Sequence, residues 1–419
     1  MGIEENVIIR EDERLAVCAL TIPISIAHSA RAEILVHVYT EALRAGAGSL
    51  TREQFLDAES KLGSHIQVSG DSRDIRFAIS ALDTNLLPTL KLFELMVTKP
   101  LFAARELARI KELLTNALIL SKEDAKSRAF EGFVDALTDK SDARFVFTAD
   151  ELIKEIKTVT IADLKKLHKT IFESVWILTS AGSLASTQKI LKSVQSVRGK
   201  NIDAKKKVHD AVPFKVRTKR AVLLTDIPHK QNIEFSIGNT LALTREDSEF
   251  PAFVFGMAVL ALYGGFSGRL MSTVREKEGL TYSIYGQTEK VTKTEQGFWR
   301  IATFFAPKDA VQGITATLRE IKLLIEKGIT EDELKRFKAI LNTRAALVND
   351  SIVKKVREVH SLREISISDE EFEAYKVKMQ KMTTKEVHSA LQKYLTLETL
   401  TISGAGPIQS IKKELEKCI

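Results

Sequence analysis

The sequence of 419 residues is poor in cysteine and has no long apolar segment. Its two cysteines, Cys18 and Cys418, lie at opposite ends without metal-ligand spacing, so neither a disulfide nor a cysteine zinc site is predicted. No run of about 18 apolar residues is present, which argues against a membrane-spanning helix. The N-terminus Met-Gly-Ile-Glu-Glu-Asn lacks a basic region followed by an apolar one, so no secretory signal is predicted. The compartment stays open between the cytoplasm and, if a signal was removed, the periplasm.

The net charge of +7 comes from one short segment. Residues 198–220 contain nine Lys or Arg and two Asp, an excess equal to the net charge of the whole chain. The rest of the sequence is neutral and lacks the interleaved aromatic and basic residues that stack nucleic-acid bases. We therefore interpret residues 198–220 as a basic linker and predict no nucleic-acid partner.

The two halves of the chain resemble each other. Glu106-Leu-Ala-Arg-Ile-Lys in the first half parallels Glu333-Leu-Lys-Arg-Phe-Lys in the second. Each half then closes with a helix, a strand and a glycine. Both closing helices are predicted to begin at a threonine N-cap with a carboxylate at the third helical position, in the pairs Thr160/Asp163 and Thr383/Glu386.

Strand-like segments precede helix-like ones within each half. A first strand is predicted from residue 15, and alternating runs beginning at Ile66 and Ile75 predict a hairpin with Gly70 and Asp71 in its turn. Helical spacing follows at residues 86–97 and 105–120. Hairpins followed by helices indicate an α+β fold, with helices packed on a mostly antiparallel sheet. The sequence thus predicts two homologous domains, residues 1–197 and 221–419, joined by the basic linker.

Residues 264–285 form the most distinctive stretch, Gly-Gly-Phe-Ser-Gly-Arg-Leu-Met-Ser-Thr-Val-Arg-Glu-Lys-Glu-Gly-Leu-Thr-Tyr-Ser-Ile-Tyr. Gly264, Gly265 and Gly268 predict a turn with closely approaching backbone, which opens a short helix carrying Arg275. Tyr282 follows at the start of a strand-like run. The stretch resembles the substrate-binding segment of the insulinase-like (inverzincin) zinc metallopeptidases, whose arginine and tyrosine lie opposite the zinc and hold the substrate backbone. The resemblance covers nearly the whole chain and implies two domains that face each other as a clamshell.

The zinc motif of that family is broken here. In its H-x-x-E-H helix two histidines bind zinc and the glutamate acts as general base. The resemblance places this motif at His37, with Thr40 replacing the glutamate and Glu41 replacing the second histidine. The distal glutamate ligand falls at Asn116 or Ala117. Threonine is no general base near neutral pH, and His37 with Glu41 supplies two ligands where zinc needs three. The chain alone is therefore expected to bind no metal and to hydrolyse no peptide.

Two other interpretations of the broken motif remain. His37 and Glu41 can form a polar pair at the edge of a core-facing helix whose apolar stripe consists of Ile34, Leu35, Val38 and Ala42. The less favoured interpretation is an active metalloenzyme that uses His37 and Glu41 with other ligands.

Some members of this family are two-subunit enzymes, in which one subunit keeps the zinc motif and the other keeps the arginine–tyrosine pair. The resemblance implies that this chain supplies Arg275 and Tyr282 in trans to the zinc site of such a partner, as a heterodimer acting on peptides. Zinc is expected in the partner only, and a homodimer of the isolated chain is an alternative assembly. The long glycine-rich loop of the mitochondrial processing peptidase's non-catalytic subunit is absent, which favours a prokaryotic type.

A competing interpretation gives the chain no part in catalysis. Arg275 would then pair with Glu276 or Glu278, Tyr282 would be an ordinary strand residue, and the protein would be a structural scaffold or a peptide-binding module. The two interpretations differ in whether Arg275 and Tyr282 act on a substrate.

Overall fold

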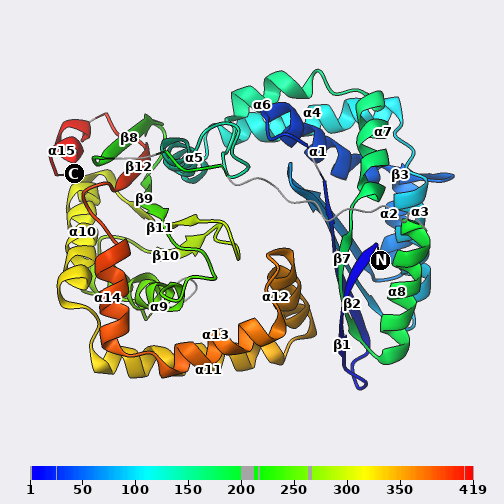
Figure 1. The fold of residues 1–419 in the computed structure, drawn as a ribbon. Coiled ribbons are helices and arrows are strands. Elements are labelled where there is room, and N and C mark those ends of the chain that lie inside the picture. The colour runs from blue at the N-terminus through cyan, green and yellow to red at the C-terminus, as the bar shows by residue number, and fades with distance from the viewer. Residues whose placement is uncertain are drawn as a thin grey trace. The chain divides into compact units, whose positions relative to one another are not determined.

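The computed structural model describes residues 2–24, 26–199, 212–215, 218–262, 267–409 and 411–418, which form two compact units (Figure 1). Unit 1 is drawn from residues 1–119, 147–210 and 345–365, and unit 2 from residues 120–146, 211–344 and 366–419. Each unit contains a five-stranded sheet with helices on both faces. The predicted α+β class with two sheet-containing halves is confirmed. Within the described ranges, no helix is both long enough and apolar enough to cross a membrane.

The sheet of unit 1 has the strand order β1-β7-β2-β6-β5. Strands β1 and β7 are parallel, and the other neighbours are antiparallel. The predicted hairpin is confirmed as β5 and β6, in which Ile75, Phe77 and Ile79 point into the core. The strands are β1 (Ile3–Ile9), β2 (Leu15–Pro23), β5 (His65–Gly70), β6 (Asp74–Leu82) and β7 (Trp176–Gly182), with a small hairpin of β3 (Gly46–Ala47) and β4 (Leu50–Thr51) beside them.

The sheet of unit 2 repeats this topology. Its order is β8-β12-β9-β11-β10, again with the first two strands parallel and the rest antiparallel. In both sheets the first strand of the half pairs with the last one, so the internal duplication predicted from the sequence is present in the fold. The strands are β8 (Ala221–Asp226), β9 (Ile233–Leu241), β10 (Ile284–Glu289), β11 (Gly297–Phe305) and β12 (Thr401–Gly406).

The helices of unit 1 include both helices predicted from apolar spacing, α3 and α4. The capping box at Thr160 and Asp163 is also confirmed, because each residue's side chain binds the backbone N–H of the other. The helices contributed by the first half are α1 (Ala30–Leu43), α2 (Arg52–Lys61), α3 (Leu86–Thr98), α4 (Ala104–Ser121), α6 (Ala149–Ile156), α7 (Ile161–Thr170) and α8 (Leu184–Arg198), with a 3-10 turn at Ile171–Glu173.

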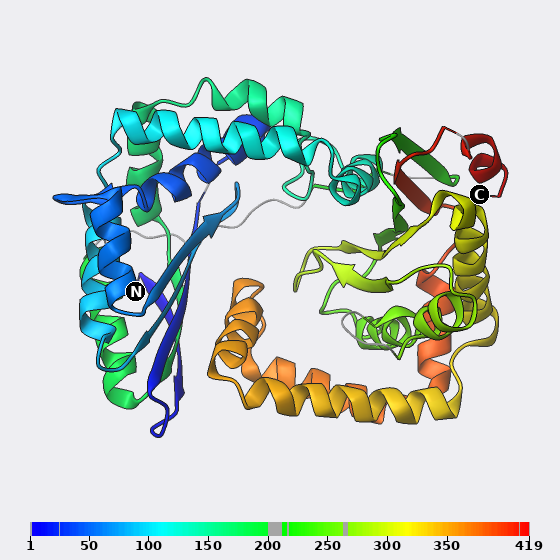
Figure 2. The same ribbon diagram turned by 180° about the vertical axis from the view of Figure 1, so that it is seen from behind.

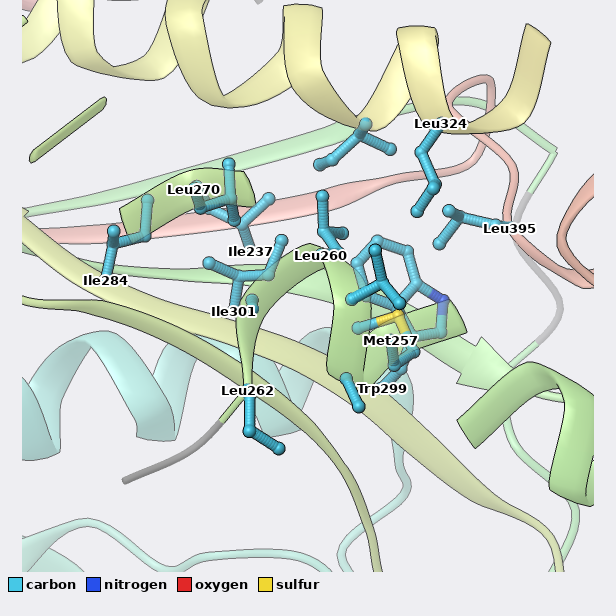
Figure 3. Packing of buried hydrophobic residues seen from close by; sticks show 14 of the residues in the cluster. Ile237, Met257, Leu260, Leu262, Leu270, Ile284, Trp299, Ile301, Leu324 and Leu395 are labelled. Atoms are coloured by element: carbon cyan, nitrogen blue, oxygen red, sulfur yellow. The ribbon is translucent and has the colours of Figure 1, made fainter. Parts of the chain in front are cut away.

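The helices of unit 2 pack around one very apolar helix, α9 (Phe250–Ala261), whose side chains are almost all buried. Figure 3 shows Met257 and Leu260 of α9 beside Ile237 and Ile301 of the sheet, with Leu324 of α10 next to them. The capping box at Thr383 and Glu386 is confirmed. The other helices are α10 (Ala310–Lys327), α11 (Glu331–Asn349), α13 (Asp369–Lys381), α14 (Thr384–Tyr394) and α15 (Lys412–Cys418), with a π-helix at Met271–Lys277 and a 3-10 turn at Pro307–Asp309.

Each unit takes one helix from the other half of the chain. Helix α5 (Ala125–Leu137) belongs to the first half but packs on β12, β9 and β8 of unit 2. Helix α12 (Ile352–Glu364) belongs to the second half but packs on β7 and β2 of unit 1, on the side opposite to α8 (Figures 1 and 2). The compact units therefore differ from the contiguous ranges 1–197 and 221–419, because residues 120–146 belong to unit 2 and residues 345–365 belong to unit 1. The intervening linker lies mostly outside the described residues.

The two exchanged helices contact their sheets differently. Helix α5 buries Ala129, Phe133 and Leu137, and a Cβ atom added to Gly132 would lie 2.5 Å from Ser403 Oγ of β12, so glycine allows the helix to approach the strand closely. Helix α12 presents His360, which is 7% exposed and lies between two threonines of the sheet. Its Nε2 is 2.8 Å from Thr21 Oγ1 and its Nδ1 is 3.1 Å from Thr179 Oγ1. The docking of α12 on unit 1 thus combines these hydrogen bonds with apolar contacts of Ile352 and Val356 to Val17 and Ala181.

Candidate functional site

The broken zinc motif lies on α1, which begins at the N-cap Ser29. His37 is 41% exposed, and its Nε2 lies 3.6 Å from Glu33 Oε1, one turn earlier in the helix. Thr40 is buried and donates its hydroxyl to the carbonyl of His37 at 3.0 Å. The predicted His37–Glu41 pair is therefore wrong, since the nearby carboxylate is Glu33 and Glu41 is exposed to solvent. The predicted stripe holds in part: Ile34, Val38 and Ala42 are buried, and Leu35 is half-buried.

The residues at the position of the distal ligand offer no replacement. Asn116 and Ala117 lie on α4, and both are exposed. Over the part of the chain that the structure describes, no group of three or more His, Cys, Asp or Glu side chains is placed to hold a metal ion. A hydroxyl that donates to its own helix backbone, as that of Thr40 does, also has no role as a base.

The Arg275 segment begins where α9 ends. Gly264 and Gly265 lie outside the described residues, whereas Gly268 is described. A Cβ atom at Gly268 would lie 2.9 Å from the carbonyl oxygen of Leu260 and 3.0 Å from Ala261 Cα, both in α9. The close backbone approach predicted for this turn is therefore present at Gly268 and requires glycine.

Arg275 lies in the π-helix Met271–Lys277. The wide helical register appears in the hydrogen bond from the N–H of Glu278 to the carbonyl of Thr273, at 3.0 Å. The helix stops at Gly279, which has a φ of +66° and whose N–H donates to the Arg275 carbonyl at 3.0 Å. Insertions of this kind widen one turn and re-aim its side chains, and they are frequent at functional sites.

The guanidinium of Arg275 and the ring of Tyr282 lie together. The distance from Arg275 Cζ to the ring centroid is 5.0 Å, a cation–π contact. Tyr282 is 74% exposed, the largest exposure among the described large hydrophobic and aromatic side chains. The exposed tyrosine presents its hydroxyl to solvent beside the half-buried guanidinium of Arg275. The structure thus brings the two predicted substrate-binding residues side by side.

The backbone next to Tyr282 is fixed by hydrogen bonds from two buried threonines. Thr281 and Thr303 are buried, and the hydroxyls of both donate to the carbonyl of Ser283 at 3.1 Å. The N–H of Ser283 in turn donates to Thr281 Oγ1 at 3.2 Å. Tyr282 therefore projects from a fixed backbone immediately before β10, as predicted for the start of a strand-like run.

Two ion pairs beside this segment were not predicted from the sequence. Glu278 was considered above as a partner of Arg275. It forms an ion pair with Arg319 of α10, in which Arg319 Nη2 lies 2.5 Å from Glu278 Oε1. Arg269, at the start of the segment, forms a two-point pair with Glu333 of α11. Both partners lie far away in the sequence, so no local spacing rule predicts them.

Comparison with known proteins shows which family this chain resembles. A family model described as the peptidase M16 inactive domain matches residues 158–341. Over 383 residues the chain is 21% identical to the non-peptidase homolog YmxG of Helicobacter pylori, covering 88% of this chain and 83% of that protein. The chain is an inactive homologue of the insulinase-like M16 peptidases.

Solved structures share the fold of this M16 homologue over its full length. One is the peptidase M16 inactive domain from Pseudomonas fluorescens, with a TM-score of 0.81 and 21% identity, covering 97% of this chain and 96% of that one. Another is a protease from Helicobacter pylori, with a TM-score of 0.77 and 13% identity, covering 96% of this chain and 97% of that one. At these identities the likeness shows the fold alone.

Proposed function

We propose that this M16 homologue is the zinc-less, substrate-binding subunit of a heteromeric metallopeptidase, and that it supplies Arg275 and Tyr282 in trans to the zinc site of a partner subunit. The observation that carries the proposal is the exposed Tyr282 held beside Arg275. Arg275 lies 5.0 Å from the Tyr282 ring, and Tyr282 is 74% exposed. A large aromatic side chain costs free energy when it is left in water, so its exposure on a fixed backbone favours a binding role.

The chemistry of the pair suits peptide hydrolysis. Zinc in the partner would polarise the attacking water. The phenol of Tyr282 can donate a hydrogen bond to the carbonyl oxygen as it gains negative charge, and the guanidinium of Arg275 can donate to the neighbouring peptide carbonyls. These donors stabilise the transition state and position the substrate.

The test is peptide hydrolysis by the chain alone and after mixing with an M16 subunit that carries an intact H-x-x-E-H motif. We expect activity in the mixture only, and its loss with a chelator. Arg275→Ala and Tyr282→Phe should each lower turnover by at least about tenfold, which corresponds to about 1.4 kcal/mol of transition-state stabilisation. Tyr394→Phe is the matched control, because it removes the hydroxyl that donates to Glu249 elsewhere in unit 2.

Unchanged turnover in both Arg275→Ala and Tyr282→Phe would refute the role in trans. A stable complex with unchanged turnover would support the alternative, a catalytically inactive scaffold or peptide-binding homologue. That alternative is supported by one observation, the exchange of α5 and α12, through which each compact unit contains a helix from the other half of the chain.

A further inference from the structure

Arg269 and Glu333 form the best-defined ion pair next to the Arg275 segment. Arg269 Nε donates to Glu333 Oε1 at 2.6 Å, and its Nη2 donates to Glu333 Oε2 at 2.7 Å. The same Nη2 donates to the carbonyl of Gly328 at 2.8 Å. The two side chains are only 16% and 15% exposed. A two-point contact of this kind fixes the orientation of both groups as well as their distance.

Glu333 is kept in its charged form by its surroundings. Burial alone would raise its pKa, but the hydrogen bonds from Arg269 and from the Thr330 backbone outweigh this and lower the pKa of Glu333 below its ordinary value. The N–H of Thr330 donates to Glu333 Oε2 at 2.8 Å, so the carboxylate is also part of the N-terminal cap of α11. The pair therefore joins the start of one helix to the start of another.

We infer that Arg269 is a positioning residue for Arg275, because the Arg269–Glu333 pair fixes the start of the helical segment whose last turn carries Arg275. The inference rests on the proposed function of Arg275. Residues 269–277 are helical without interruption. Thr273 Oγ1 donates to the carbonyl of Arg269 at 2.7 Å, which links the anchored residue to the turn that precedes Arg275.

Helix α11 holds the same segment at a second point. Arg336 Nη2 donates to the carbonyl of Ser267 at 3.2 Å, two residues before Arg269. With Gly268 packed against α9, the three consecutive residues 267–269 are thus each fixed by a different contact. The helix that carries Arg275 consequently starts from a rigid base.

The internal repeat provides an independent argument. In the first half, Glu106 pairs with Arg109 three residues later in the same helix, at 2.7 Å. Glu333 and Arg336 occupy the corresponding positions of the second half. There the glutamate binds Arg269 and the arginine binds the Ser267 carbonyl. The two residues of the repeated motif hold each other in the half without Arg275, and hold the Arg275 segment in the half that has it.

The consequence for catalysis follows from geometry. A shift of about 1 Å in a positioning group can cost up to about 100-fold in rate. Arg269→Gln removes the fork, and Arg269→Lys keeps the positive charge but cannot reproduce the two-point contact. We expect both variants to lower kcat of the reconstituted complex by about 10- to 100-fold with a smaller change in KM. Arg109→Gln, which breaks the corresponding pair of the first half, should leave kcat unchanged.

Two measurements test the inference. The first is amide hydrogen exchange in the chain alone, which should become faster at residues 270–280 in Arg269→Gln and stay unchanged there in Arg109→Gln. The second is a double-mutant cycle for turnover with the zinc-motif subunit. If Arg269 acts through Arg275, Arg269→Gln should add little to the loss already caused by Arg275→Ala.

The outcomes separate this inference from the proposed function. If Arg275→Ala leaves turnover unchanged, the function in trans is wrong, whereas exchange at residues 270–280 still shows whether Arg269 anchors the segment. If Arg275→Ala lowers turnover but Arg269→Gln changes neither exchange nor kcat, the positioning role is wrong and the function stands. Additive losses in the double variant would also overturn it. Arg269→Lys, which retains the charge opposite Glu333, serves if Arg269→Gln fails to fold.

Discussion

The docking of α12 on unit 1 makes a quantitative prediction for His360→Ala. Thr21 Oγ1 donates to Glu364 Oε1 at 2.7 Å, so Thr21 can only accept from His360 Nε2. His360 therefore carries its proton on Nε2, and its Nδ1 accepts from the hydroxyl of Thr179. Removing the imidazole breaks both hydrogen bonds; the Thr21 hydroxyl keeps its bond to Glu364, whereas the buried Thr179 hydroxyl loses its acceptor. At about 1 kcal/mol for each bond plus the lost packing, we expect unit 1 to be destabilised by about 2–4 kcal/mol at pH 7.5.

The size of this effect should depend on pH. Burial lowers the pKa of His360, and Arg76 adds to this, although Glu364 opposes it. A group with a lowered pKa contributes stability that is fully present above its unfolded pKa, here about 6.5, and that is lost as the pH falls through the folded pKa. The free-energy difference between the wild type and His360→Ala should therefore be larger at pH 7.5 than at pH 5.5.

A neighbouring carboxyl group changes in the opposite direction and must be separated from His360. Burial raises the pKa of Asp74 to about 7, and Asp71 and Glu364 add to this against the effect of Arg76. The contribution of Asp74 to the free energy of unfolding is present at low pH and is lost as the pH rises through about 7. Because Asp74 is present in both proteins, the difference in unfolding free energy between the wild type and His360→Ala reports mainly on the histidine.

The chain offers a fluorescence assay specific to unit 1. Its two tryptophans are Trp176 on β7 of unit 1 and Trp299 on β11 of unit 2, and both are fully buried. Trp299 Nε1 has no hydrogen-bond partner among the described residues, so Trp299→Phe loses no hydrogen bond. In that background, urea unfolding followed by Trp176 emission reports the free energy of unit 1. An equal destabilisation at both pH values, or a larger one at pH 5.5, would refute the conclusion that His360 is buried in its neutral form.

Two further predictions concern unit 2, read by Trp299 emission. Gly132→Val should destabilise unit 2 by about 1–3 kcal/mol, because a Cβ atom at this position would lie 2.5 Å from Ser403 Oγ. Adding Ser403→Ala should recover part of this loss. If Gly132→Val leaves the free energy of unfolding unchanged, the described packing of α5 is wrong. Asp142→Asn should destabilise unit 2 by about 3–5 kcal/mol. The Arg144 guanidinium lies 2.6 Å from the Asp142 carboxylate and is only 5% exposed, so it would be left buried without its counter-charge. A destabilisation below about 1 kcal/mol would show that the ion pair contributes little to stability.

Features that depend on neighbouring residues could be predicted from the sequence. The capping boxes at Thr160 and Thr383 need only residues three positions apart, and the hairpin of β5 and β6 needs only alternation and a turn. The order of strands and helices repeats between the halves, so the α+β class with two sheet-containing halves also follows. These are short-range rules, and the structure obeys them.

The destination of α5 and α12 could not be predicted in this way. An apolar stripe such as that of α5 shows which face of a helix is buried, but not which of two similar sheets covers it. The same limit applies to the site. Arg275 and Tyr282 were found through a family resemblance, whereas the Arg269–Glu333 pair joins residues 64 positions apart and has no spacing signature. His37 was misassigned because Glu33 and Glu41 are equally distant from it along the helix, and only the side-chain direction separates them.

The exchange of α5 and α12 also sets the order in which the chain can fold as the ribosome makes it. The sheet of unit 1 is complete once β7 ends at Gly182, but α12, which covers one of its faces, ends only at Glu364. At about 5–20 residues per second, the intervening stretch takes roughly 10–35 s to synthesise. During that time the face that carries Thr21 and Thr179 lacks its helix. Unit 2 has the reverse history, since α5 emerges before the sheet that it will cover. A nascent chain of this protein therefore needs protection first at its N-terminal sheet.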